Sequence, residues 1–317
     1  MSIAEDTLYD ILDLINANRM VLFLGAGSTR PCRRPDGSPG LSGQELADEI
    51  LKILNGGKDP GFQVPLTKAA EFYVTSTPAA RASLDDLIRR RLAGLQPTLG
   101  HLLVTLFPWK AIITTNYNVV IEEAYRIAIR DGFSLKKLRS VFRDDDLISI
   151  PKESSDLLLY KPHGCISAED DGTNRLIVTS KDYFDSAGLR PRMYETLNSL
   201  VKDSSTLFIG YSMDDYTFKN IYYDLQDQLG LWQMRLYNVS RKQHDLLFKW
   251  TEKSLDKDFN TTLVRTTFEA FMVQLLLYQG KSLHPVLKEK ILEKWPEVMR
   301  RNKSYLDEKA LESMKTL

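Results

Sequence analysis

The stretch Ile112-Ile113-Thr114-Thr115-Asn116-Tyr117-Asn118 decides the fold, because an apolar run stops abruptly at a polar cluster with two amides. This pattern is typical of a buried strand that carries polar groups to its C-terminal end, where open α/β sheets bind ligands. Residues 119–130 follow with apolar positions at helical spacing. The stretch therefore predicts a strand, a polar turn and a helix. An ordinary turn with an Asn cap fits the same residues, so other turns must decide between the two.

The composition limits the class of protein. The chain has 317 residues, of which 43% are hydrophobic, and its 42 basic residues balance its 42 acidic ones. A neutral chain has no general attraction to nucleic acid or to anionic membranes. The apolar runs are far shorter than the roughly 20 residues that span a bilayer, and residues 1–6 do not resemble a signal peptide. We expect a soluble, cytoplasmic protein that binds neither nucleic acid nor membrane.

Metal and disulfide sites are not expected. With only Cys32 and Cys165, the chain has no disulfide framework and too few cysteines for a four-Cys zinc site. The four histidines do not show metal-ligand spacing; they are His101, His163, His244 and His284. His101 and His244 fall inside predicted helices and are interpreted as packing or surface groups.

Strand-length and helix-length patterns alternate along the chain. Further buried strands are predicted at 20–24, 157–160, 176–178, 206–209, 234–239 and 261–264. Helices are predicted at 3–18, 42–54, 99–107, 193–202, 216–228, 241–255 and 268–279. Ser42 and Glu45 have the spacing of a capping box. This alternation predicts an α/β fold with a doubly wound, mostly parallel, Rossmann-like sheet.

Two segments stand outside this pattern. Residues 55–97 contain short helical patterns without a strand, and they are too long for an ordinary crossover, so they predict a small helical insertion beside a cleft. Residues 281–317 predict a helical C-terminal extension, broken or kinked at Pro296. An apolar stripe recurs along the extension at Leu283, Leu287, Ile291, Trp295 and Val298. The stripe either packs back on the main domain, 1–280, or contacts a partner.

Four predicted strands end in chemically distinctive turns. These turns are Gly25-Ala26-Gly27-Ser28-Thr29, residues 114–118, Lys161-Pro162-His163-Gly164 and residues 210–215. A parallel sheet brings its C-terminal strand ends to one edge, so we expect a single crevice lined by all four. The glycines let backbone approach a phosphate beside a helix N-terminus. The dinucleotide fingerprint is incomplete, since Arg30 replaces its third glycine, and a tight backbone turn is the alternative.

His163 is the histidine placed at a predicted strand end. A histidine side chain ionises at about pH 6.5, so it can accept a proton near neutrality. As an isolated residue it also fits a structural role. The acidic run 144–146 fits a solvated loop better than a cation site, because consecutive residues do not share one face.

Taken in order, these turns resemble those of the sirtuin superfamily, and in particular its bacterial sirtuin-like branch associated with antiphage defence. The resemblance covers residues 18–280. The matching residues are Gly25, Ala26, Gly27 and, one place early, Ser28 for GAGxS; Thr114, Thr115, Asn116 and Tyr117 for TTNYD; His163 and Gly164 for the HG pair; and Gly210 and Ser212 for GxS. The zinc module of protein deacylases cannot form, because its four cysteines are absent.

The resemblance implies an enzyme that consumes NAD as its substrate, releasing nicotinamide and ADP-ribose without a metal. Asn116 would orient water or the ribose, and His163 would be the base. The other residues expected to bind NAD are Gly25, Ala26, Gly27, Ser28, Thr115, Asn118, Gly210, Ser212 and Asn238. Asn118 replaces the usual Asp, at the position that contacts the nicotinamide carboxamide, and an amide bonds without charge.

The resemblance also implies control, since constant NAD hydrolysis would kill the cell. We expect a homo-oligomer and a protein partner that activates or represses the enzyme. Two other classes of function stay open. One is an NAD or ADP-ribose sensor without turnover, and the other is an NAD-dependent protein deacylase or ADP-ribosyltransferase.

Overall fold

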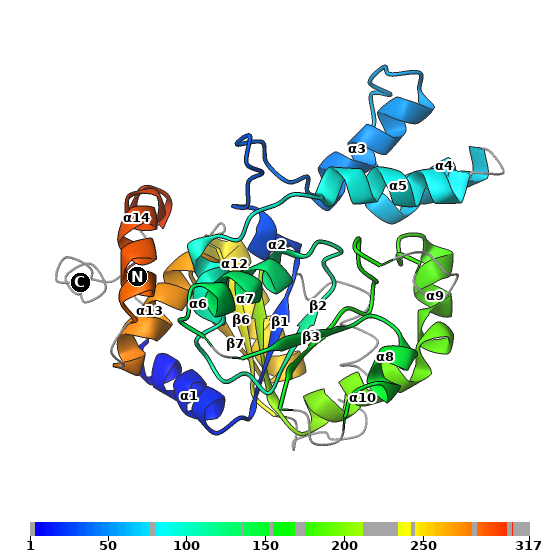
Figure 1. Cartoon of the computed structure of the whole chain (residues 1–317). Helices are drawn as coiled ribbons and strands as arrows, with labels where there is room; N and C mark the ends of the chain where they lie inside the picture. Colours follow the sequence, from blue (N-terminus) through cyan, green and yellow to red (C-terminus); the bar gives the residue numbers. More distant parts are fainter. Residues whose placement is uncertain are drawn as a thin grey trace.

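The chain forms a parallel α/β sheet covered by helices on both faces (Figure 1). The computed structural model describes residues 4–76, 80–134, 136–151, 155–168, 175–211, 234–241, 245–280, 284–302 and 306. The strands are β1 (Met20–Leu24), β2 (Ala111–Thr114), β3 (Leu138–Val141), β4 (Leu157–Tyr160), β5 (Ser205–Ile209), β6 (Leu236–Ser240) and β7 (Thr261–Arg265). They form a seven-stranded sheet in the order β3-β4-β2-β1-β5-β6-β7, and every pair of neighbours is parallel. The predicted doubly wound, Rossmann-like fold is confirmed.

The central strands read as continuous apolar runs because both faces of the sheet are buried. In β1, Leu22 and Leu24 point to one core and Val21 and Phe23 to the other. The first core is covered by α1 (Glu5–Asn16), α6 (Leu99–Val104), α7 (Val120–Arg130) and α13 (Phe268–Gln279). The second is covered by α8 (Asp144–Ile148), α10 (Pro191–Lys202) and α12 (Asp245–Phe259).

The strand order reverses at β1. In the sheet, β2, β4 and β3 lie in this order on one side of β1. The later strands β5, β6 and β7 lie on the other side. In open α/β sheets such a reversal leaves a crevice outside the carboxyl ends of the strands, where ligands bind. The short helix α2 (Ala26–Thr29) starts at this point, directly after β1.

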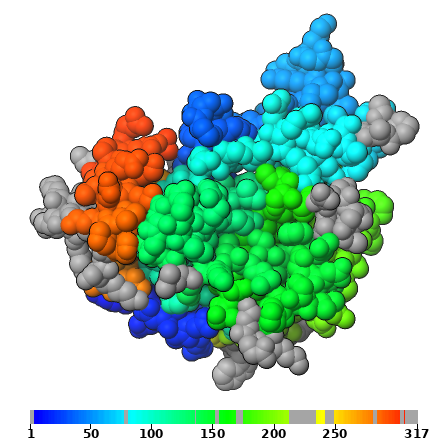
Figure 2. Space-filling model, viewed as in Figure 1, coloured from blue at the N-terminus to red at the C-terminus, as the bar shows by residue number. Residues whose placement is uncertain are grey.

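A helical unit stands over this end of the sheet and projects from the body of the molecule (Figures 1 and 2). It consists of α3 (Gly43–Leu54), α4 (Leu66–Ser76) and α5 (Ala80–Leu92) around an apolar core of its own. The capping box forms at its start: Glu45 N–H donates to Ser42 Oγ at 3.2 Å, and Ser42 N–H donates to Glu45 Oε2 at 2.7 Å. The unit includes α3 as well as the predicted insertion.

The observed strands differ from the predicted ones in two places. Residues 176–178 were predicted to be a strand, but this segment pairs with no strand of the sheet. Leu176 and Val178 pack instead into the core of the helical unit, which explains their apolar character. In contrast β3 was not predicted, because this edge strand is only half buried and carries polar residues.

The C-terminal extension packs on the domain. Helix α14 (Pro285–Asn302) runs on past Pro296, so it is not broken there, and the alternative of a kink at Pro296 stays a prediction. Leu287, Ile291 and Val298 of the apolar stripe join the core that contains α13 and α6, and Trp295 packs against it. Leu283 and the predicted helix 216–228 lie outside the described residues. Within the part of the chain that the structure describes, no helix is long and apolar enough to cross a membrane.

Candidate active site

The sheet register brings the predicted turns together. Ile113 of β2 pairs with Tyr160 of β4, and Asn116 and His163 each follow this pair by three residues. The two side chains therefore leave neighbouring parallel strands at the same level of the same edge. On the other side of β1, Leu24 pairs with Ile209, so the turns that begin at residues 25 and 210 are also neighbours.

The glycine turns pack backbone against backbone. Gly25 N–H donates to Ile209 O at 3.0 Å, and Gly27 N–H donates to Gly210 O at 2.7 Å. A Cβ on Gly27 would lie 2.7 Å from the Cα of Gly210. Gly210 has a φ of +63°, and a Cβ there would lie 2.2 Å from the backbone N of Ser28. These glycines are thus required for the close approach of β1 and β5, as the tight-turn alternative predicts, and phosphate binding by Gly25, Ala26 and Gly27 stays a prediction.

Asn116 is tied to the first glycine turn. Its Nδ2 donates to Gly25 O at 3.0 Å, and the fully buried Ser28 donates from Oγ to the same carbonyl at 2.7 Å. Thr114 Oγ1 donates to Leu24 O at 2.7 Å and accepts from Asn116 N–H at 3.1 Å. Because Gly25 O can only accept, the amide nitrogen of Asn116 must face it, which turns Oδ1 away from the turn. Thr115 is half-buried in the same turn.

A small cavity lies beneath Asn116. It has a free volume of about 10 Å³, close to the space that one water needs. Its walls are formed by Leu24, Ser28, Thr29, His101, Thr114, Asn116, Asn118, Val120 and Ile121. Ser28, Asn116 and Asn118 were predicted site residues, and the structure places all three on this cavity.

His101 was predicted to be a packing or surface group, but it also lines the cavity. Its Nδ1 accepts from Thr98 N–H at 3.3 Å, so a neutral ring carries its proton on Nε2. Burial lowers the pKa of His101 to about 3, which keeps the ring neutral. In the sequence, the signal for this contact was the Thr-x-x-His spacing at the start of α6. A residue in the third helical position can fold back and bond to the residue that caps the helix.

Asn118 accepts two hydrogen bonds, one with its side-chain oxygen and one with its backbone carbonyl. Its Oδ1 accepts from Val120 N–H at 3.3 Å, whereas the N-cap residue of α7 is Val119, so Asn118 is not the cap of this helix. Its carbonyl oxygen accepts from Lys161 Nζ at 2.6 Å. The side chain is 7% exposed. Its amide Nδ2 is therefore the polar group of Asn118 that can serve a ligand, and nicotinamide binding by this residue stays a prediction.

Lys161 joins the turn after β2 to the turn after β4. Its side chain is fully buried, and Nζ donates to Glu122 Oε1 at 2.9 Å as well as to the Asn118 carbonyl. A buried ammonium group is stable only when it is paired and hydrogen-bonded. The charge of Lys161 thus fixes the two turns to each other.

His163 lies in an aromatic cage. Its ring centroid is 5.0 Å from that of Tyr183 in an edge-on arrangement and 6.4 Å from that of Tyr117. The side chain is 2% exposed. Its carbonyl oxygen accepts from Ile177 N–H at 3.0 Å, and Gly164 follows with a φ of +88°, which favours glycine.

The position of Asn238 differs from the prediction. Asn238 was expected near a strand end, but it lies within β6, paired with Phe208 and Leu263. It is buried, and its Oδ1 has no partner among the described residues. Ser212 lies outside the described residues. Among those that are described, no group of three or more His, Cys, Asp or Glu side chains is placed to hold a metal ion.

The chain is similar to known proteins. Residues 110–264 match the family model described as the SIR2-like domain. NAD(+) hydrolase ThsA of Acinetobacter baumannii (strain 532279) is 24% identical over 263 residues, which cover 81% of this chain and 48% of that protein. The protein of the same name from Enterococcus faecium is 25% identical over 236 residues, which cover 73% of this chain and 45% of its own length.

This chain thus spans about half the length of the curated relatives it matches. Among solved structures, a Sir2 protein bound to acetylated peptide aligns with a TM-score of 0.46 and 13% identity, over 87% of this chain and 99% of that one. The family model includes the turns that carry Asn116 and His163. The chain is therefore similar to SIR2-like proteins over residues 110–264, a stretch inside the region in which its motifs predicted a resemblance to sirtuins.

Proposed function

We propose that the protein hydrolyses NAD to nicotinamide and ADP-ribose. The observation that carries the proposal is the sheet register, in which Asn116 and His163 follow paired residues of the neighbouring strands β2 and β4. Asn116, Ser28 and Asn118 also line one small cavity. The SIR2-like match and the names of two relatives, both NAD(+) hydrolases, support it. NAD acts here as the substrate, and no metal takes part.

The reaction breaks the bond between the ribose C1′ and the nicotinamide nitrogen. The electrons of that bond leave with nicotinamide, and a water oxygen bonds to C1′, so that NAD and water give nicotinamide, ADP-ribose and one proton. Asn116 Oδ1, which faces away from Gly25, accepts a hydrogen bond from the water or a ribose hydroxyl. His163 accepts the released proton.

The glycine turns and their neighbours hold the rest of NAD. Backbone N–H groups near Gly25, Ala26 and Gly27 bind the diphosphate together with Ser28, and Gly210, Ser212 and Asn238 serve the adenosine side. Thr115 and Asn118 lie at the nicotinamide end. Because Asn118 Oδ1 already accepts from Val120 N–H, its Nδ2 donates to the carboxamide oxygen.

Release of nicotinamide from NAD by the purified full-length chain tests the proposal. The wild-type protein should release nicotinamide and ADP-ribose in equal amounts, and Asn116→Ala and His163→Ala should each lower the rate at least about 100-fold. Arg90→Gln, an exposed change on α5, should leave the rate unchanged. Unchanged turnover in both alanine variants would refute the assignment, and NAD binding without products would favour a sensor.

We further propose that assembly or a protein partner controls this activity, in a role in antiphage defence. A freely running NAD hydrolase would exhaust its host, so activity should depend on protein concentration or on a second component. The apolar stripe of α14 is buried against the domain and is not the surface for that contact. Light scattering and NAD hydrolysis over the same concentration series test this; a monomer that is fully active throughout would contradict it.

A further inference from the structure

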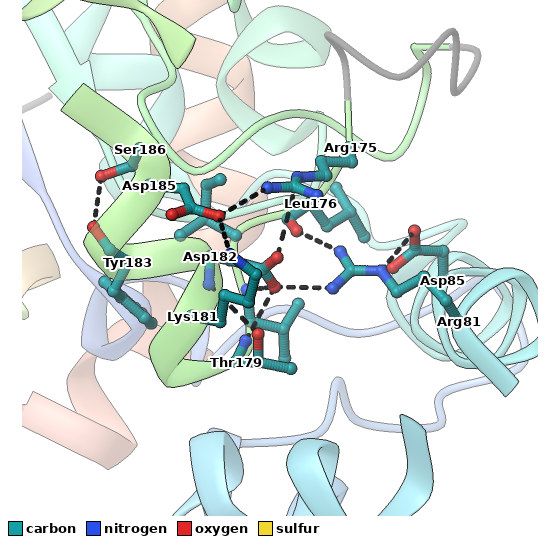
Figure 3. A network of polar contacts seen from close by, with 12 residues as sticks. Arg81, Asp85, Arg175, Leu176, Thr179, Lys181, Asp182, Tyr183, Asp185 and Ser186 are labelled. Atoms are coloured by element: carbon teal, nitrogen blue, oxygen red, sulfur yellow. Dashed lines mark hydrogen bonds and ion pairs between the residues drawn. The ribbon is translucent and has the colours of Figure 1, made fainter. Parts of the chain in front are cut away.

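Two arginines of the projecting helical unit contact two segments that follow the HG turn, and Figure 3 shows the contacts of Arg81. Arg81 and Arg89 lie on α5, and two helical turns separate them, so they share one face of the helix. Neither is explained by the chemistry of the proposed reaction. Each contacts backbone carbonyls far away in the sequence.

Arg89 holds the segment that directly follows Gly164. Its Nη1 donates to Ile166 O at 2.6 Å, to Ala168 O, and more weakly to Cys165 O at 3.5 Å. Hydrogen bonds from a charged donor are roughly twice as strong as neutral ones. A single guanidinium thus binds three carbonyls within residues 165–168, directly after the HG turn.

Arg81 contacts a second segment, residues 176–182, which follows later in the chain. Its Nη2 donates to Leu176 O, and its Nη1 donates to Asp182 Oδ2 at 2.6 Å. Asp182 is buried and caps α9 (Ser180–Leu189) through Thr179 N–H at 2.9 Å (Figure 3). Arg81 thereby fixes both the extended segment at 176 and the first turn of α9.

Both of these structures contact His163 directly. Ile177, next to Leu176, donates its N–H to His163 O, and its own carbonyl accepts from Tyr117 OH at 2.5 Å. Tyr183, next to Asp182, places its ring edge-on to the His163 ring. The path from Arg81 to the histidine therefore passes through a single residue in each case. The carbonyls of Cys165 and Ile166, which Arg89 contacts, lie two and three residues after His163.

We propose that Arg81 and Arg89 are positioning residues for His163, so that the projecting helical unit takes part in the proposed reaction. The inference rests on the proposed function for its effect on rate, and on the contacts alone for its effect on structure. Misplacement of a reacting group by about 1 Å can cost on the order of 100-fold in rate. The arginines act on the orientation of His163 and do not touch NAD.

Arg89→Gln is the sharpest variant, because the partners that Arg89 contacts are carbonyls and the change leaves no carboxylate without its counter-ion. It should lower kcat about tenfold or more, while KM for NAD stays within about threefold. Arg89→Lys keeps one charged donor and should recover part of the loss. Arg90→Gln on the same helix is the matched control, since Arg90 is exposed.

Amide deuterium exchange, followed by mass spectrometry on the full chain, measures how well the backbone at these positions is protected. This measurement does not depend on activity. Arg89→Gln should raise exchange at least about tenfold in residues 163–168, and Arg81→Gln in residues 175–183. The strands β1 and β5 should stay protected in both variants. The Arg90→Gln protein should match the wild type throughout.

The outcomes separate the two proposals. If the wild-type protein does not hydrolyse NAD but the exchange pattern appears, the proposed function fails and the structural inference stands. Wild-type exchange and wild-type kcat in both glutamine variants would overturn the inference. So would a fall in kcat that accompanies increased exchange over the whole chain, because that result shows general destabilisation without a local effect on His163.

Discussion

The two sides of the candidate site are held in place by different physics. On the side of β1 and β5, backbone meets backbone at Gly25, Gly27 and Gly210, and a single added carbon has no room. On the side of β2 and β4, the turns are joined by long charged side chains, among them Lys161 and Arg89. The steric contact between the glycine turns allows only one arrangement of these two turns. Contacts through charged side chains can adapt, so the HG turn is the side on which control is expected to act.

The largest effect is expected where the glycine turns meet. Gly210→Ala places a Cβ at 2.2 Å from the backbone N of Ser28 and at a φ of +63°, so the stability should fall by about 3 kcal/mol or more. Gly37→Ala isolates the cost of the backbone conformation, because Gly37 has a φ of +81° and no atom within 4 Å of the added carbon. It should cost only about 1 kcal/mol.

Urea unfolding at neutral pH measures both changes. The excess loss in Gly210→Ala over Gly37→Ala reports the contact between the two turns alone. Equal losses in the two variants would show that the turns separate readily, and the contrast between a rigid and an adaptable side would not hold.

A smaller loss is expected for the charged side. Lys161→Met removes a fully buried ammonium group and leaves Glu122 without its counter-ion. Because the Glu122 side chain is 23% exposed, water compensates in part, and we expect a loss of about 2 kcal/mol. Adding Glu122→Gln should recover part of it, since the uncompensated charge is then gone.

The same pair of variants tests how the two turns are joined. Thermal unfolding of the single and double variants gives the coupling between Lys161 and Glu122. A double variant that is less stable than Lys161→Met, with the two losses simply additive, would show that Lys161 acts by filling space and that its charge does not link the turns.

The sequence is informative where neighbours in sequence define the structure. A glycine or polar turn after an apolar run is contained in a few consecutive residues, and β1, β2 and β5 were predicted for that reason. Parallel pairing then follows from alternation, so Asn116 and His163 could be placed at one edge before their register was known. The same reasoning placed Ser28 and Asn118 in the site.

What the sequence did not reveal depends on contacts between distant residues. Arg81 and Arg89 have the pattern of surface arginines on a helix, and their carbonyl partners are 76 to 95 residues away. Residues 176–178 are apolar because they enter the core of the helical unit, which local pattern cannot distinguish from a strand. His101 has only local capping as a signal, and its place on the cavity is set by the packing of α6 on the sheet.

The smallest effect is expected at His101, where the two sides of the site meet at the cavity. Burial lowers its pKa to about 3 in the folded protein, whereas the unfolded chain should have a value of about 6.5. Between these values the unfolded state binds a proton that the folded state does not bind, so stability is greatest above about pH 6.5 and falls as the pH is lowered. From pH 7.5 to 5.5, this single group should cost about 1.4 kcal/mol.

His101→Gln removes the titrating group and keeps a polar side chain on the cavity. The stability of the variant should therefore change less than that of the wild type between the two pH values, and the difference between the proteins cancels the contribution of all other groups. Urea unfolding of both proteins at pH 7.5 and 5.5 gives this difference. If the two proteins lose the same stability, His101 ionises freely in the folded state, and the junction between the rigid side and the adaptable side opens to water.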